Sequence, residues 1–338
     1  MNDTNLNNTV LRFMTCGSVD DGKSTLIGRL LYDTKTILTD TLNQIEKTSK
    51  KKGMSALDLS LITDGLQAER EQGITIDVAY RYFSTGTRKY IIADAPGHEQ
   101  YTRNMVTAAS TAELAIILVD ARKGMLTQTR RHSYLTKLVG IKHIIVAINK
   151  MDLVDYSEEE YKNICDEYKS FASAIGLKEP NIDVKFVPMS ALNGDMIVDR
   201  GKSLRWYKGP TLLQILENTD ATEKSNSSSL RFPVQFVCRP RDSSNEKLHD
   251  FRAFMGRVES GLMKVNEKIK VLPSHHESTI KEIRIGDKVI TEASLEQSVT
   301  VSLNDEIDIS RGDMLIHQED TLESVKSFNA NVCWLAET

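Results

Sequence analysis

Runs of apolar residues and runs with helical spacing alternate along the first two thirds of the chain. Apolar or alternating runs predict strands at residues 10–16, 77–83, 88–94, 114–119, 143–148 and 183–187. Apolar positions that recur every three or four residues predict helices at 23–31, from after His98 to about 109, and at 127–139, 157–175 and 211–217. Strands separated by helices of this length are typical of right-handed βαβ crossovers. We therefore expect an α/β domain with a doubly wound, mostly parallel sheet.

Two segments depart from this alternation. Only residues 84–87 separate the strands at 77–83 and 88–94, so these strands are predicted to form an antiparallel hairpin. Residues 32–72 are largely polar, and helices are predicted there at about 39–52 and 56–71.

Beyond residue 219 the pattern changes to that of a second domain. Residues 220–229, with the sequence DATEKSNSSS, are polar and without periodicity, which is typical of a linker. Short alternating runs then predict strands at 232–238, 252–258, 268–272, 278–285, 298–303 and 306–309. This pattern indicates a small all-β barrel, so we expect domains at 1–219 and 230–324. One more strand is predicted at 327–334.

Composition and charge narrow the class of protein. The 338 residues are 40% hydrophobic and 27% charged, which is ordinary for a globular protein. The net charge of −4 gives no excess of positive charge that would attract a nucleic acid. No apolar segment is long enough to cross a membrane. The four cysteines are far apart, which favours buried thiols over a disulfide framework. We expect a cytoplasmic protein that binds neither nucleic acid nor a membrane.

The loop between the first strand and the first helix carries a phosphate-binding pattern. Residues 17–24 read GSVDDGKS, a full match to G-x-x-x-x-G-K-S/T. The glycines let the backbone N–H groups point at a phosphate, and the following helix presents its positive end to the same anion. Lys23 is expected to reach the β- and γ-phosphates, and Ser24 is expected to ligate Mg²⁺. The pattern indicates a nucleoside triphosphate but does not identify its base.

Three further motifs follow predicted strands and indicate guanine. Asp94 is expected to hold Mg²⁺ through water. The N–H group of Gly97 is expected to contact the γ-phosphate. Asn149 and Asp152 can bond the edge of guanine, because a carboxylate accepts two N–H donors that adenine does not offer together. Residues 190–191 are expected to donate an N–H to the guanine oxygen. Four motifs in this order, each at a strand's C-terminal end, favour a GTPase.

Two more residues are candidates for catalysis beside Lys23. Thr75 is expected to ligate Mg²⁺ with its hydroxyl, in a segment that GTP orders and hydrolysis releases. His98 follows Gly97, and this position favours a role in orienting the attacking water over that of a plain surface histidine. The predicted nucleotide-binding residues are Gly17, Ser18, Val19, Asp20, Asp21, Gly22, Lys23, Ser24, Thr25, Asp94, Gly97, Asn149, Lys150, Asp152, Ser190, Ala191 and Leu192. The predicted metal ligands are Ser24, Thr75 and Asp94.

Two other features allow more than one interpretation. Trp206 and Tyr207 lie in the loop 195–210, where they either contact a partner or pack the loop against its own domain. Lysines occupy positions 50–52, and a solvated helix end is favoured there over a contact with nucleic acid.

The motifs and the following barrel resemble the translational GTPase superfamily, to which elongation factor Tu belongs. Within it, the chain is similar to the large, GTPase subunit of bacterial sulfate adenylyltransferases. One stretch that carries this resemblance is GSVDDGKSTL at 17–26, in which Asp21 stands where elongation factors have a histidine. The others are DGLQAEREQGITIDVAY at 64–80, APGHEQYTRNM at 95–105, WYKGPTLL at 206–213, DFRAF at 250–254 and GRVESG at 256–261.

The resemblance implies both an activity and a partner. It implies GTP and GDP as ligands, Mg²⁺ as cofactor, and a separate small catalytic subunit that makes adenosine 5′-phosphosulfate and pyrophosphate from ATP and sulfate. GTP hydrolysis on this chain would be coupled to that reaction. It also implies an apolar gate of Val19 and Ile74 that keeps His98 away until a partner acts. Family members carry a third domain, another barrel, so residues 325–338 are expected to be the first strand of an incomplete third domain.

Two other functions are compatible with the nucleotide motifs. One is a translation-factor-type GTPase that binds RNA or the ribosome, and the other is a nucleotide-switched interaction module. Asp21, the polar segment 32–72 and the net charge of −4 speak against the first. Pyrophosphate release that depends on GTP, in the presence of sulfate and a partner subunit, would exclude the second.

Overall fold

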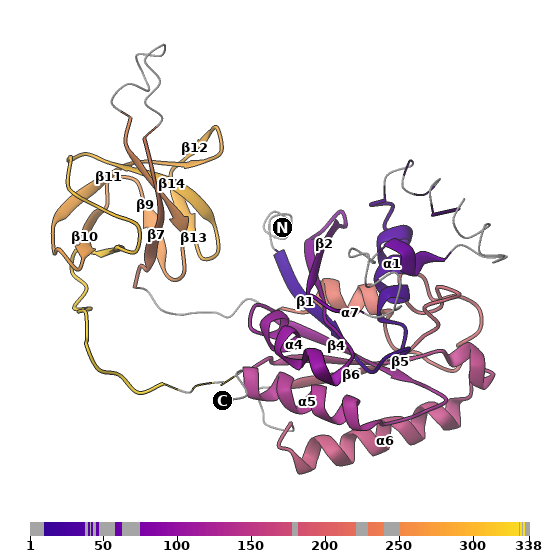
Figure 1. The fold of residues 1–338 in the computed structure, drawn as a ribbon. Helices are drawn as coiled ribbons and strands as arrows, with labels where there is room; N and C mark the ends of the chain where they lie inside the picture. The colour runs from indigo at the N-terminus through magenta and orange to yellow at the C-terminus, as the bar shows by residue number, and fades with distance from the viewer. Residues whose placement is uncertain are drawn as a thin grey trace. The chain divides into compact units, whose positions relative to one another are not determined.

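The chain forms two compact units, Met1–Ala221 and Thr222–Thr338 (Figure 1). The computed structural model describes residues 10–37, 40, 42, 45–46, 58–62, 75–177, 182–220, 229–239, 251–330, 332 and 334. Most of the helices predicted at 39–52 and 56–71 lie outside the described residues, as does most of the linker at 220–229. The domain limits 1–219 and 230–324 therefore stay predictions.

The first unit contains a six-stranded sheet in the order β2-β3-β1-β4-β5-β6. Its strands are β1 (Val10–Cys16), β2 (Ala79–Ser84), β3 (Lys89–Asp94), β4 (Leu114–Asp120), β5 (His143–Asn149) and β6 (Asp183–Pro188). Strand β2 runs antiparallel to β3, and the other neighbours are parallel. All seven residues of β4 are buried because helices cover both faces, which explains why the strand is a continuous apolar run. This sheet confirms the predicted fold class.

Figure 1 shows α1 and α7 on one side of this sheet and α4, α5 and α6 on the other. The helices are α1 (Lys23–Asp33), α4 (Thr102–Ala109), α5 (Thr127–Val139), α6 (Glu158–Ala174) and α7 (Leu212–Asn218). Ser157 caps α6, and Thr211 forms a capping box with Gln214 at the start of α7, so both side chains fix where a helix begins. None of the described helices has the length and apolar character needed to cross a bilayer.

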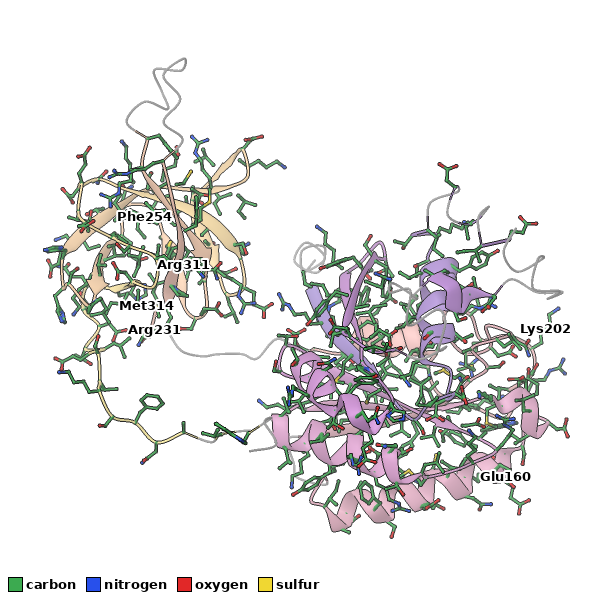
Figure 2. The ribbon with its side chains drawn as sticks, viewed as in Figure 1. Glu160, Lys202, Arg231, Phe254, Arg311 and Met314 are labelled. Atoms are coloured by element: carbon green, nitrogen blue, oxygen red, sulfur yellow. The ribbon has the colours of Figure 1, made fainter. Side chains whose placement is uncertain are left out.

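The second unit is an antiparallel barrel. Its strands are β7 (Phe232–Cys238), β8 (Ala253–Arg257), β9 (Leu262–Lys264), β10 (Lys268–Leu272), β11 (Glu277–Ile285), β12 (Lys288–Ile290), β13 (Glu292–Ser294), β14 (Ser298–Leu303) and β15 (Met314–His317). Seven of them follow the order β10-β15-β7-β8-β14-β11-β12, and a further pairing of β10 with β11 closes the ring. Phe254 is 3% exposed in its core (Figure 2). The unit confirms the predicted β domain.

The strand predicted at 306–309 is wrong, and β15 takes its place in the barrel. The Arg252 guanidinium donates hydrogen bonds to the carbonyl oxygens of Ile307 and Ile309, at 2.9 and 3.3 Å. These carbonyls therefore have a side-chain partner instead of a neighbouring strand. The alternating pattern of the segment reflects the burial of Ile309, which is 2% exposed.

The strand predicted at 327–334 is absent from the part of that segment that the structure describes. Phe328 and Trp334 are 78% and 73% exposed there. A strand needs a neighbour to pair its N–H and C=O groups, and these described residues pair with none. An incomplete third domain at 325–338 stays a prediction.

Stability should fall in mild acid because of one buried histidine on α5. Burial, with the nearby charges of Lys23 and Arg131, lowers the pKa of His132 from 6.5 to about 4. Below pH 6.5 the His132 side chain binds a proton in the unfolded chain but stays neutral in the folded chain until about pH 4. The contribution of this residue to stability is therefore complete above pH 6.5 and is lost as the pH falls toward 4. Between pH 7 and pH 5 we expect a loss of about 2 kcal/mol from this residue. Urea unfolding at both pH values should show a smaller loss in His132→Gln, whereas the exposed-residue control His276→Ala should behave like the wild type.

Candidate functional site

The phosphate-binding pattern lies in the loop between β1 and α1, and two of the glycines in and around this loop have no room for a side chain. Gly22 adopts a φ of 95°, and a Cβ atom there would lie 2.5 Å from Nδ2 of Asn149. A Cβ atom on Gly97 would lie 2.8 Å from the carbonyl oxygen of Gly17. The loop after β3 and the loop after β1 therefore approach each other as backbone against backbone.

The Lys23 ammonium lies inside the phosphate loop. The side chain is 7% exposed, and Nζ donates to the carbonyl oxygens of Gly17 and Ser18, at 3.1 and 2.8 Å. Burial lowers the pKa of Lys23, and the charge of Asp94 opposes this. Asp94, at the end of β3, is 1% exposed and accepts a hydrogen bond from Oγ1 of Thr15 at 3.2 Å. A cation and an anion are thus buried together at one edge of the sheet.

A cavity of about 320 Å³ brings most of the predicted phosphate-binding and catalytic residues together. Its lining residues are Val19, Asp20, Gly22, Lys23, Ser24, Thr25, Ser60, Thr75, Gly97, His98 and Lys150. Ser60, from the 3₁₀-helix η2 (Leu59–Ile62), was not predicted, because no motif marks this polar segment. Ser24 and Thr75 both carry a hydroxyl and share this cavity, although they come from different segments and lie 51 positions apart in the sequence.

His98 caps the 3₁₀-helix η3 (Glu99–Tyr101) that follows Gly97. Its Nδ1 accepts a hydrogen bond from the Gln100 N–H at 3.4 Å, and the side chain is half-buried beside the cavity. On the next segment, the Asn104 amide donates to the carbonyl oxygen of Ile76 at 2.8 Å and so holds the chain next to Thr75. Ile74 lies outside the described residues, and the predicted gate of Val19 and Ile74 stays a prediction.

The Asn149 side chain joins the phosphate loop to the loop after β6. Its Nδ2 donates to the carbonyl oxygen of Asp21 at 2.8 Å, and its Oδ1 accepts from the Ala191 N–H at 2.9 Å. The Ser190 N–H donates to the carbonyl oxygen of Asp195 at 3.2 Å. Of the N–H groups at 190–192, only that of Leu192 has no acceptor among the described residues. The Leu192 N–H therefore stays available as a hydrogen-bond donor in this loop.

Asp152 lies in the 3₁₀-helix η4 (Met151–Val154) directly after β5. Its side chain is half-buried and makes no hydrogen bond to a residue that the structure describes. Among the predicted base-binding groups, this carboxylate and the Leu192 N–H thus keep their hydrogen-bonding capacity.

Lys150 lies between the base-binding and phosphate-binding loops. Its Nζ forms an ion pair with Oδ2 of Asp120 at 3.0 Å and donates to the carbonyl oxygen of Asp20. Burial of Asp120 favours the neutral acid, but hydrogen bonds from Arg122 and Lys150 outweigh this and lower the pKa of Asp120. Asp120 was not predicted as a site residue. It is the last residue of β4 and follows an apolar run, as Asp94 does at the end of β3, so the same signal could have found it.

Trp206 and Tyr207 pack the loop 195–210 against its own unit. The Trp206 indole N–H donates to the carbonyl oxygen of Tyr156 at 2.8 Å, and the Tyr207 hydroxyl donates to that of Phe186 at 2.9 Å. Both rings also lie against Tyr161, with centroids 5.2 and 5.9 Å away. Of the two interpretations of these aromatic residues, packing is the one confirmed.

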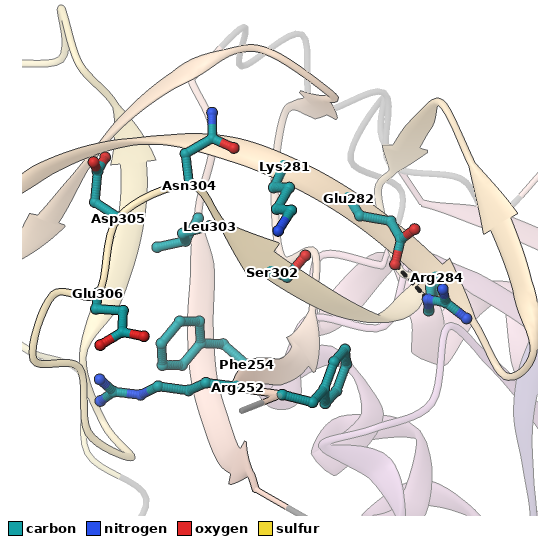
Figure 3. Close-up of a pocket in the computed structure, with 11 residues that line it drawn as sticks. Arg252, Phe254, Lys281, Glu282, Arg284, Ser302, Leu303, Asn304, Asp305 and Glu306 are labelled. Atoms are coloured by element: carbon teal, nitrogen blue, oxygen red, sulfur yellow. Dashed lines mark hydrogen bonds and ion pairs between the residues drawn. The ribbon is translucent and has the colours of Figure 1, made fainter. Parts of the chain in front are cut away.

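A larger cavity, of about 570 Å³, lies in the barrel unit (Figure 3). It holds none of the predicted site residues. In its lining, Arg284 pairs with Glu282, and Arg252 donates to backbone carbonyl oxygens. Among the described residues no cluster of histidine, cysteine or acidic side chains is suited to a metal ion, and the thiols of Cys16, Cys165 and Cys238 are free.

The fold and the site define a GTP-binding domain of the translational GTPase class. Residues 8–225 match the family described as the elongation factor Tu GTP binding domain. The likeness extends further: the chain is 54% identical over 331 residues to sulfate adenylyltransferase subunit 1 of Yersinia enterocolitica serotype O:8 / biotype 1B (strain NCTC 13174 / 8081). The alignment covers 97% of the chain and 67% of that protein. The chain therefore belongs to the family of sulfate adenylyltransferase subunit 1, the GTPase subunit.

Other relatives agree with this family. Subunit 1 of Cronobacter sakazakii (strain ATCC BAA-894) is also 54% identical, and the alignment covers 97% of the chain and 68% of that protein. The solved structure of the S. cerevisiae Ski7 GTPase-like domain, bound to GDP and inorganic phosphate, matches with a TM-score of 0.57 at 20% identity. That match covers 93% of the chain and 76% of the Ski7 structure, and it supports the fold alone. The predicted family is confirmed, and neither alternative function gains support.

Proposed function

We propose that the chain hydrolyses GTP and couples this hydrolysis to sulfate activation on another subunit. That subunit, a separate small catalytic chain, would form adenosine 5′-phosphosulfate and pyrophosphate from ATP and sulfate in the cytoplasm. The observation that carries the proposal is the cavity that places Lys23, Thr75 and His98 together beside the loops joined by Asn149. The designation of the relatives as subunit 1 supports the existence of a second chain.

Two residues that line the cavity, together with Asp94 near Lys23, suit Mg²⁺. Ser24 and Thr75 offer hydroxyl oxygens and Asp94 offers a buried carboxylate, and oxygen donors of this kind are the ligands that Mg²⁺ prefers. When bound, the ion supplies positive charge that lowers the cost of the negative charge on the phosphates. Lys23 would exchange its carbonyl partners for phosphate oxygens, and the glycine backbone at Gly97 would allow a phosphate to approach closely.

Guanine would be recognised by Asp152 and by the Leu192 N–H. A carboxylate that makes no hydrogen bond within the described chain can accept the two N–H donors of the guanine edge. The Leu192 N–H would donate to the guanine oxygen. Asn149 would act mainly by holding these loops at a fixed separation, since both of its polar atoms already have partners.

His98→Ala should slow GTP hydrolysis while GTP binding remains. The imidazole lines the cavity beside Gly97, and we assign to it the orientation of the attacking water. Loss of one group that positions or polarises a reactant typically costs about 100-fold in rate. Single-turnover hydrolysis should show this loss, and the dissociation constant for GTP should stay within about twofold. An unchanged rate would remove His98 from the mechanism, and the exposed residue His276 of the barrel provides a matched His276→Ala control.

Coupling to sulfate activation can be tested with the assembled subunits. Formation of a phosphosulfate anhydride is unfavourable, so a linked hydrolysis is needed to draw it forward. The chain should be coexpressed with a candidate adenylyltransferase subunit, and pyrophosphate release from ATP and sulfate measured with GTP or a non-hydrolysable analogue. We expect GTP, but not the non-hydrolysable analogue, to raise the yield of pyrophosphate. An equal yield with the analogue, or with no guanine nucleotide, would overturn the coupling.

A further inference from the structure

Asp21 is a buried acid within the phosphate loop. It is 1% exposed, and its Oδ2 accepts a hydrogen bond from the Ser18 N–H at 2.6 Å. The Asp21 N–H donates in return to the carbonyl oxygen of Ser18 at 3.4 Å. The two residues thus close a small ring that fixes the turn from Ser18 to Asp21.

The peptide group between Gly17 and Ser18 is held at both ends by opposite charges. Its N–H donates to the Asp21 carboxylate, and its carbonyl oxygen, that of Gly17, accepts from the Lys23 ammonium at 3.1 Å. The N–H and C=O of a trans peptide point in opposite directions, so its dipole lies between an anion and a cation. Hydrogen bonds to charged groups are stronger than neutral ones, and neighbouring bonds in a chain polarise each other. The Asp21 carboxylate therefore helps to set the place of the Lys23 ammonium through this one peptide.

This arrangement has a cost in stability. Oδ1 of Asp21 is buried and has no hydrogen-bond partner among the residues that the structure describes. Burial raises the pKa of Asp21, while Lys23 and the Ser18 amide oppose this. A buried acceptor without a partner lowers stability, which offsets part of what the hydrogen bond to the Ser18 N–H contributes.

We infer that Asp21 is a positioning residue for nucleotide binding. Its carboxylate orients the peptide between Gly17 and Ser18, and this peptide holds the Lys23 ammonium in the loop before the nucleotide arrives. The inference rests on the proposed nucleotide site. Once phosphates are bound they hold Lys23 themselves, so the effect belongs to affinity and KM and leaves the rate at saturating GTP nearly unchanged.

Two variants separate this role from a general structural one. Asp21→Ala removes the acceptor and should weaken GDP and GTP binding about tenfold, because a charge-assisted hydrogen bond is lost. Asp21→Asn keeps an acceptor for the Ser18 N–H and should bind within about threefold of the wild type. Single-turnover hydrolysis at saturating GTP should change less than about twofold in both. The Asp320→Asn control removes an acid paired with Arg231 in the other unit and should leave affinity unchanged.

Several results would overturn the inference. It fails if Asp21→Ala binds GDP as the wild type does, or if Asp21→Asn is as weak as Asp21→Ala. It also fails if Asp21→Asn lowers the free energy of unfolding of the nucleotide-free chain by as much as it lowers the free energy of nucleotide binding. The role would then be structural. A wild-type chain that binds no guanine nucleotide would instead refute the proposed function.

Hydrogen exchange on the unaltered protein gives a second measurement that needs no variant. The Ser18 amide, which donates to Asp21, should exchange more slowly than the Val19 amide in the nucleotide-free chain. Val19 is the matched neighbour, since its N–H donates to no described acceptor. Equal exchange of the two amides would show that the Asp21 bond is not formed, and this reading does not depend on nucleotide binding.

Discussion

Lys23→Ala should weaken GTP binding about 1000-fold, because the removal of one partner from a buried ionic interaction costs several kcal/mol. The ammonium is 7% exposed, and its two backbone acceptors hold it at the centre of the phosphate loop. Without it, the phosphates would face the carbonyl oxygens of Gly17 and Ser18 and the buried acid Asp94 with less compensating charge.

Isothermal titration calorimetry with GTP and Mg²⁺ would measure this effect. Lys23→Met keeps most of the side-chain length without the charge and should lose nearly as much affinity, which separates charge from packing. Lys162→Ala, on the exposed face of α6, provides the surface control. A loss below about tenfold would mean that the phosphates do not contact this ammonium.

The second large effect is a change of base specificity in Asp152→Asn. An amide in place of the carboxylate offers one acceptor and one donor. Xanthine has an oxygen where guanine has its amino group, so the amide can donate to that oxygen and accept from the neighbouring ring N–H, and it matches xanthine better than guanine. Sites that hydrogen-bond a substrate group reject an analogue that lacks it, and we expect the ratio of GTP to XTP affinity to fall by about 1000-fold.

Competition between GTP and XTP for one fluorescent nucleotide would report the ratio directly. The variant should fold normally, because Asp152 makes no hydrogen bond to a described residue that the change would break. Asp166→Asn, on the exposed surface of α6, is the matched control. A variant that retains the guanine preference would show that another group selects the base.

The sheet and much of the barrel could be predicted because their pattern is local. Strand β4 is buried on both faces, and its apolar run leaves no alternative to a central strand. The observed bounds of β7, β10 and β14 equal the predicted ones, since each is an alternating run that ends at a turn. Ser157 and Thr211 were predicted as helical residues but cap their helices from outside, a difference of one position.

The errors arise where a distant side chain decides the structure. Nothing near residues 306–309 in the sequence indicates that Arg252 supplies their carbonyl partners. The site shows the same limit. The motifs placed Lys23 and His98 at one cavity, but the contacts that join Asn149 to Asp21 and Ala191 exist only in three dimensions. These contacts also occupy the Ala191 N–H and leave that of Leu192 available.

The pairing of β10 with β11 has a consequence for how the barrel can be recognised. Among the described strands, the closed ring leaves free backbone edges at β12, which pairs only with β11, and in the separate pair of β9 and β13, so these are the places where a foreign strand could be added. Another protein that docks elsewhere on this ring must read side chains or turns rather than extend the hydrogen-bonded backbone.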